Sequence, residues 1–97
     1  VLMITVIIFE MNGWREWTHR ARTKDAQTAI IRAMNKHFPR SYHFVPDDID
    51  NAPVLFESVT RTPNVKITGH IWKPMWNRGI CWSVKGPSVI VTLIQGD

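Results

Sequence analysis

The chain has 97 residues, of which 44% are hydrophobic and 21% are charged, and its formal net charge is +4. This length suits one compact unit with one core, so we treat residues 1–97 as a single domain. The composition excludes a disordered tail, a collagen repeat and a low-complexity segment.

A predicted β-hairpin opens the chain. Residues 3–11 are rich in β-branched and aromatic side chains, which strands favour, and Asn12-Gly13 is a strong signal for a type I′ turn. Residues 14–22 then return as the second strand. A two-residue turn sets the register so that paired residue numbers add up to 25, which places Glu10 opposite Arg15. We expect the first strand to be central in its sheet and the second to lie nearer an edge.

An amphipathic helix is predicted to follow the hairpin. Thr23 is its expected N-cap, Asp25 falls in its first turn, and Pro39 ends it. Apolar positions recur at helical spacing at Ala26, Ala29, Ile30, Ala33, Met34, His37 and Phe38. This stripe is the face expected to pack on a sheet.

Residues 40–64 are less regular. Residues 42–45 fit a short strand, residues 46–53 have the composition of a loop with a proline at each end, and residues 54–60 fit either a strand or a short helical turn. The segment from 46 to 60 contains no Lys or Arg and four acidic residues, Asp47, Asp48, Asp50 and Glu57. It is either a solvated acidic loop or a docking site for a basic partner.

Three strands are predicted in the C-terminal part. Residues 65–72 alternate between apolar and polar, residues 73–79 are expected to form a connection, and residues 80–85 form the next strand. Gly86-Pro87-Ser88 is expected to turn the chain. Residues 89–94 are apolar on both faces, which fits a strand in the interior of the sheet.

The predicted order of elements is therefore β-β-α-β-β-β. Consecutive strands joined by short turns pair in antiparallel fashion. We predict an α+β two-layer sandwich, with an antiparallel sheet of about five strands and one amphipathic helix packed on one face.

Tryptophan is the most unusual component, with five in 97 residues. Trp17 and Trp82 are expected in the core, since each indole buries a large area. Trp76, in the predicted connection, and Trp14, beside the hairpin turn, are the candidates for exposure. Exposed indoles beside cations can stack on unpaired bases or anchor a protein interface.

Basic residues accompany these aromatic residues. Those of the second strand and the helix are expected to form one stripe, which is either a ribbon for a DNA groove or a solvated face. They are Arg15, Arg20, Arg22, Lys24, Arg32 and Lys36. The predicted contact residues are Trp14, Arg15, Arg20, Arg22, Arg32, Lys36, Lys73, Trp76 and Arg78.

No pattern typical of catalysis or metal binding stands out. The histidines and Cys81 show no CxxC, HxxxH or HExxH spacing, and His37 on the helix stripe fits a hydrogen-bonded boundary residue. A nucleophilic pair of Cys81 and His70 would lack a third, orienting residue. The chain has no glycine-rich nucleotide motif. We therefore expect no metal, no cofactor and no enzymatic activity.

Localisation follows from the same counts. The apolar runs fall short of the roughly 20 residues that cross a membrane, and no secretory signal is recognisable. The single cysteine, Cys81, can form no internal disulfide. We expect a cytoplasmic protein without a membrane partner.

The leading hypothesis is a small non-enzymatic binding protein. Its basic, Trp-rich surface would contact nucleic acid or a protein complex that handles nucleic acid. The alternative is a protein-binding inhibitor or adaptor, such as a phage or mobile-element protein of the anti-CRISPR type that blocks a host defence complex. An exposed edge strand would also allow two copies to form a homodimer. A small hydrolase or nuclease using His and Asp is the least favoured hypothesis.

Overall fold

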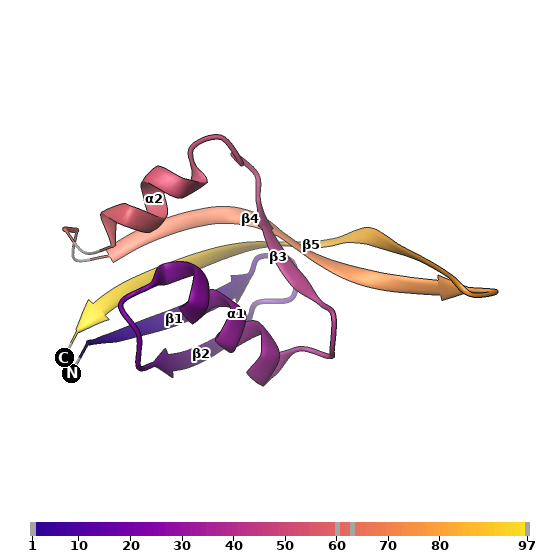
Figure 1. Ribbon diagram of the computed structural model, residues 1–97, viewed down its shortest axis with the longest axis horizontal. Coiled ribbons are helices and arrows are strands. Elements are labelled where there is room, and N and C mark those ends of the chain that lie inside the picture. The colour runs from indigo at the N-terminus through magenta and orange to yellow at the C-terminus, as the bar shows by residue number, and fades with distance from the viewer. Residues whose placement is uncertain (1, 60, 63, 97) are drawn as a thin grey trace.

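The computed structural model describes residues 2–59, 61–62 and 64–96. Its strands are β1 (Met3–Glu10), β2 (Arg15–Ala21), β3 (His43–Pro46), β4 (Asn64–Asn77) and β5 (Ile80–Gly96), and its helices are α1 (Ala26–His37) and α2 (Ala52–Ser58). The strands form one antiparallel sheet in the order β2-β1-β5-β4-β3 (Figure 1). The α+β two-layer sandwich with five antiparallel strands is confirmed, and the central places of β1 and β5 and the edge position of β2 are as predicted.

The order of elements differs from the prediction in its second half. The chain runs β-β-α-β-α-β-β, with two helices where one was expected. Residues 54–60, which fitted either a strand or a helical turn, lie mostly in α2, and the short strand near residues 42–45 is β3. Pro53 lies in the first turn of α2, where a proline costs nothing because that N–H has no helical partner. Thr60 lies outside the described residues.

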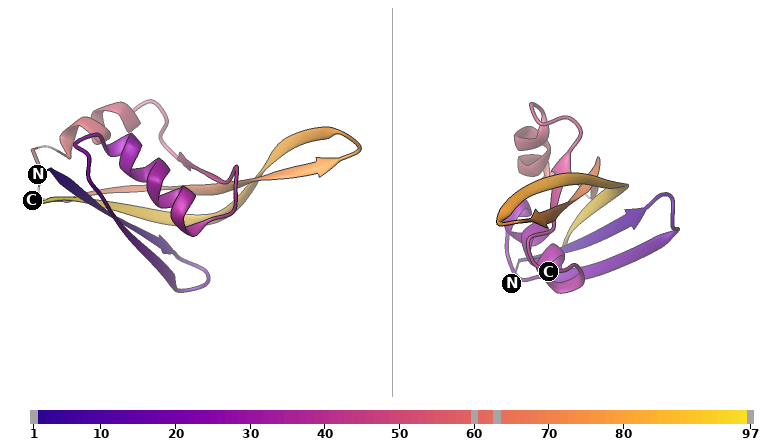
Figure 2. Two further views of the ribbon diagram at one scale, coloured as in Figure 1. Left: turned by 60° about the horizontal axis from the view of Figure 1, so that its bottom comes forward. Right: turned by 90° about the vertical axis from the view of Figure 1, so that its right-hand side faces the viewer.

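Both helices cover the same face of the sheet (Figure 2). The core lies between these two layers because strand residues alternate between the faces. On β1 the helix-facing side chains of Ile4, Val6 and Ile8 are buried, whereas their neighbours on the other face are half-buried. The predicted stripe of α1 packs on this layer, with Ala26, Ala29, Ile30, Ala33 and Met34 buried.

The β1–β2 hairpin has the predicted register but a different turn. Ile4 pairs with Ala21, and Glu10 pairs with Arg15, so the paired numbers add up to 25. The left-handed residue is Trp14, with φ of 53°, and Asn12-Gly13 does not form the expected type I′ turn. The chain instead closes through four residues, 11–14, between the two strands. The loop still closes on the pair Glu10–Arg15, so the register of the two strands is the predicted one. The predicted pairing is therefore correct although the predicted turn type is wrong.

The start of α1 lies two residues later than predicted. Asp25, and not Thr23, is the N-cap, and its carboxylate accepts hydrogen bonds from the backbone N–H and the hydroxyl of Thr28. Thr23 supports the cap from outside the helix, because its hydroxyl accepts a hydrogen bond from the N–H of Asp25 at 3.1 Å. At the other end of the helix, His37 Nε2 donates to the carbonyl of Thr18 at 3.0 Å, as expected for a boundary histidine.

β4 and β5 are much longer than predicted, with 14 and 17 residues. The predicted connection at 73–79 is wrong, because these residues continue β4 as far as Asn77. The predicted turn at 86–88 is also wrong, because β5 runs straight through it. A register shift between His70 and Trp72 shows a β-bulge there instead.

The predictions for this hairpin were wrong because its glycine and proline residues were interpreted as signs of turns. A Cβ on Gly86 would lie 2.3 Å from the carbonyl oxygen of Ile71, so this glycine permits a close backbone approach in the bulge and does not mark a turn. Pro74 lies in a two-stranded ribbon, opposite Ser83. Such a ribbon is an edge on both sides, where a residue without an N–H is tolerated.

Candidate nucleic-acid interface

The β4–β5 hairpin projects beyond the rest of the sheet (Figure 1). β3 pairs with β4 as far as Trp72, and β1 pairs with β5 from Val89 onward. In the part of the chain that the structure describes, residues 73–84 pair only with one another, and we call them the arm. The arm makes the molecule elongated, with extents of 46 × 25 × 24 Å.

A tight turn forms the tip of the arm. Arg78 and Gly79 both have positive φ, 51° and 79°, and Asn77 pairs with Ile80 on either side of them. Two consecutive left-handed residues are typical of a type I′ turn, whose twist matches that of the flanking strands. The exposed Arg78 is therefore held at the outermost point of the molecule.

Strand alternation gives the arm and its base two faces. Residues directly opposite each other in an antiparallel pair lie on the same face. One face, the Trp76 face, carries the pairs Trp72–Lys85, Pro74–Ser83 and Trp76–Cys81. The other, the Trp82 face, carries the pairs Lys73–Val84, Met75–Trp82 and Asn77–Ile80.

Large apolar side chains are exposed on both faces of the arm. Trp76 is 69% exposed, Ile80 65%, Trp82 45% and Met75 40%. The expected exposure of Trp76 is confirmed, but the expected burial of Trp82 in the core is wrong. Trp82 does lie in a strand, as predicted, but that part of the strand extends beyond the helices that bury the other strands (Figure 1).

Every charged side chain of the arm is a cation. Lys73 and Arg78 lie within it and Lys85 lies at its base, and all three are exposed. The sequence contains no Asp or Glu between residues 58 and 96. A surface of exposed indoles and unneutralised cations is suited to a flat, anionic ligand.

Trp14 lies close to the base of the arm. The N–H of Met11 donates to the carbonyl of Ser88 at 3.3 Å, which ties the β1–β2 turn to β5 just beyond the bulge. Trp14 is 81% exposed, and its indole meets the ring of Phe9 edge-on with 6.0 Å between centroids. Trp14 therefore presents a second exposed indole near the arm.

Arg15, a predicted contact residue, forms an ion pair within the protein. Its guanidinium lies 2.9 Å from the carboxylate of Glu10, which is 9% exposed, and 5.4 Å from the centre of the Trp17 ring. Glu10 balances this charge, so Arg15 is a weaker candidate for phosphate contact than the cations of the arm. Trp17, which was expected in the core, is partly buried and packs against the core from its edge.

The predicted basic stripe is not one surface. Arg15 and Arg20 are five residues apart in β2, so their side chains lie on opposite faces of the sheet. Arg22 and Arg32 do meet, since the Arg32 guanidinium donates to the Arg22 carbonyl at 3.3 Å. Lys36 is exposed near the other end of α1. Of the predicted contact residues, the structure brings Lys73, Trp76 and Arg78 together in the arm.

Neither a metal site nor a cysteine–histidine pair forms among the described residues. Among them, no group of three or more His, Cys, Asp or Glu could hold a metal ion. His70 pairs with Ser88 and bonds Asp47 through Nδ1 at 2.8 Å, whereas Cys81 pairs with Trp76 far out on the arm, so these two residues do not meet. The sequence analysis missed the His70–Asp47 hydrogen bond because 23 residues separate its members.

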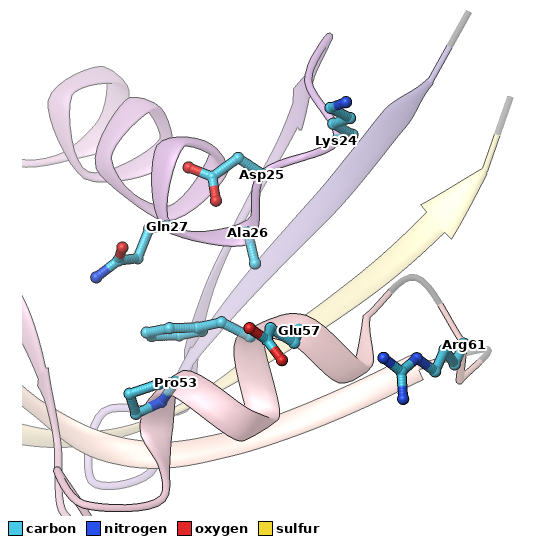
Figure 3. Close-up of a pocket in the computed structure, with 8 residues that line it drawn as sticks. Lys24, Asp25, Ala26, Gln27, Pro53, Glu57 and Arg61 are labelled. Carbon is cyan, nitrogen blue, oxygen red and sulfur yellow. The ribbon is translucent and has the colours of Figure 1, made fainter.

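A second concave surface lies between α1 and α2. An apolar groove of about 330 Å³ is lined by Ile30, Ile31, Phe44, Ile49 and Phe56, among others, and we call it the α1–α2 groove. A wider pocket of about 640 Å³ continues from it past the start of α1, and its lining includes Lys24, Asp25, Glu57 and Arg61 (Figure 3). The described side chains of this wider pocket include two acids and two bases but no Ser, Cys or His that could act as a nucleophile.

Comparison with known proteins identifies no relative of this chain: no protein-family model, curated protein or solved structure matches it. Within the described residues, neither helix has the length and apolar character needed to cross a membrane.

Proposed function

We propose that this chain is a non-enzymatic nucleic-acid-binding protein that contacts single-stranded nucleic acid through its arm. The observation that carries the proposal is the exposure of Trp76 next to Arg78 on a projecting ribbon whose charged groups are all cations. A side chain that contributed mainly to folding would be covered by another layer of the protein. The exposure of this indole therefore supports a role in binding.

The Trp76 face offers stacking positions for bases. Trp72 and Trp76 lie four residues apart on it, which is about 13 Å along a strand. Stacking of a base on an aromatic ring contributes roughly 1–3 kcal/mol and needs an unpaired base. This requirement favours a single strand over a duplex.

The cations supply the electrostatic part of binding. Lys85 shares the Trp76 face, and Arg78 lies at the tip that both faces share. Each phosphate neutralised on a single strand lowers the slope of log affinity against log salt by about 0.7. Two such contacts predict a slope of about −1.4, so affinity falls moderately as salt is raised.

Fluorescence anisotropy with labelled single-stranded and duplex oligonucleotides, measured across a salt series, tests the proposal. Replacing Trp76 with Thr is expected to weaken single-strand binding about tenfold or more, because one stacking partner is lost. Arg78→Asn is expected to reduce the salt slope by about 0.7. Asn is chosen because it tolerates the left-handed backbone of residue 78, which Ala does not.

Ile80→Thr is the matched control. Ile80 is 65% exposed, close to the 69% of Trp76, but it lies on the opposite face of the arm. It should leave oligonucleotide affinity unchanged. Absence of binding at low salt, or equal losses in the Trp76 and Ile80 variants, would contradict the proposal.

A protein-binding inhibitor or adaptor is the second candidate function. The observation that favours it is the Trp82 face, where Met75, Ile80 and Trp82 are exposed together. Clustered apolar and aromatic side chains anchor protein interfaces. This function predicts that Ile80→Thr weakens binding to a protein partner, whereas Trp76→Thr, on the opposite face, leaves that binding unchanged.

A further inference from the structure

We infer that the α1–α2 groove binds the Trp82 face of the arm of a second copy of this chain, so that two copies exchange arms in a symmetric dimer. The inference is independent of nucleic-acid binding, because it uses the face of the arm opposite to Trp76. It rests on two apolar surfaces and on their opposite charges.

The groove presents apolar side chains that the fold leaves uncovered. Ile49 is 66% exposed and Ile31 is 59% exposed, and both line the groove together with Phe44 and Phe56. Its volume of about 330 Å³ is in the range of pockets that enclose a bulky group. An exposed apolar groove of this kind is typical of a binding surface.

The loop that borders the groove at Ile49 is negatively charged, whereas the wider pocket at the other end carries both acids and bases. Ile49 lies between Asp48 and Asp50 in the sequence, and the segment from 46 to 60 has four acidic and no basic residues. The arm has the reverse composition, since Lys73 lies on the Trp82 face and the arm has no acid. Complementary potentials steer and orient association, so the arm of this same chain meets the requirements of the groove.

A chain cannot fill its own groove with its own arm. The arm points away from both helices (Figures 1 and 2). From Lys73 to Arg78 it reaches about 17 Å beyond the flanking strands, somewhat less than the 24 Å short dimension of the molecule. That length suffices to reach across to a neighbour. Reciprocal exchange about a two-fold axis would cover both grooves and both Trp82 faces at once.

The oligomeric state of the full chain, measured by sedimentation equilibrium at low ionic strength without nucleic acid, tests the inference. Replacing either Ile49 or Trp82 with Ser is expected to raise the dissociation constant of the dimer at least about tenfold, because each removes an apolar anchor. Val54→Ser is the matched control. Val54 is as exposed as Ile49, at 66%, but lies on α2 outside the groove, so the dimer should persist.

A charge exchange provides the specific test. Lys73→Glu and Asp50→Lys are each expected to weaken the homodimer, because like charges then face one another at both contacts. Mixing the two variants is expected to restore a heterodimer, since each groove then meets an arm of opposite charge. Circular dichroism verifies that both variants are folded.

Three results would overturn the inference: a monomer at every concentration, a dimer that Ile49→Ser and Trp82→Ser leave intact, or failure of the mixed charge variants to associate. A dimer that resists these changes would point to pairing through an edge strand or through the uncovered sheet face. None of these outcomes bears on the proposed oligonucleotide binding, because its test substitutions, Trp76→Thr and Arg78→Asn, lie outside the Trp82 face.

Discussion

Single residues decide local conformation in this protein, and Asp25 illustrates how. Its carboxylate accepts hydrogen bonds from the side chain and the backbone N–H of Thr28, and these bonds, in that order, lower the pKa of Asp25 below its ordinary value of 3.8. The ionised form is therefore stabilised in the folded state. This contribution is complete above the unfolded pKa and is lost as pH falls through the folded one.

Asp25→Ala is expected to lower the free energy of unfolding at neutral pH by about 1 kcal/mol, the usual cost of losing an N-cap. The difference from the natural chain should shrink as the pH falls below 3.8, because protonation weakens the cap of the natural chain. Urea unfolding at a series of pH values measures this. Asp25→Asn is the control: it keeps a capping oxygen without a titrating group and should retain most of the stability. A difference that stays constant down to low pH would contradict the account.

At the scale of elements, the sequence correctly predicted the features that depend on the spacing of apolar residues. The stripe of α1 and the pairing of β1 with β2 follow from apolar spacing and from a short turn, and both are confirmed. The β4–β5 hairpin was predicted poorly because Gly86, Pro87 and Pro74 are typical of turns as well as of bulges and edges. Which of these a glycine occupies depends on the strand beside it, which the local sequence does not specify.

In the candidate site, too, the local sequence predicted which residues are neighbours but not how the fold exposes them. The sequence identified Trp76, Lys73 and Arg78 as neighbours because they are close in the chain. It did not predict that they lie on a projecting ribbon, nor that Trp82 is exposed, because exposure there depends on where the helices end. The predicted stripe in β2 and α1 failed because a charge pattern was read without the alternation of strand faces.

Gly86→Ala tests the bulge as an element. The added methyl would lie 2.3 Å from the carbonyl oxygen of Ile71, and backbone cannot give way as a flexible side chain can. We expect a loss of about 1–3 kcal/mol in the free energy of unfolding, as for other overpacked sites. Gly96→Ala, at a position where an added Cβ meets nothing within 4 Å, should be close to neutral. Equal stability of the two variants in urea unfolding would contradict this role of the bulge.

The whole molecule consists of a packed body and an unpacked arm. The most deeply buried side chains come from β1, β4, β5, α1 and the end of α2, whereas each residue from 72 to 88 is at least partly exposed. A two-stranded hairpin is marginally stable in water without a covering layer. We therefore expect a ligand or partner to cover the apolar side chains of the arm, because this would offset the cost of keeping them exposed to water.

Indole N–H signals in a two-dimensional NMR spectrum, followed during titration with a single-stranded oligonucleotide, test this claim most directly. The five tryptophans give separate probes, assigned by one substitution each. We predict that the signal of Trp76 shifts most and that the signal of Trp17, which packs against the core, stays in place. Titration that leaves Trp76 unmoved, or that shifts Trp17 as much as Trp76, would contradict the account.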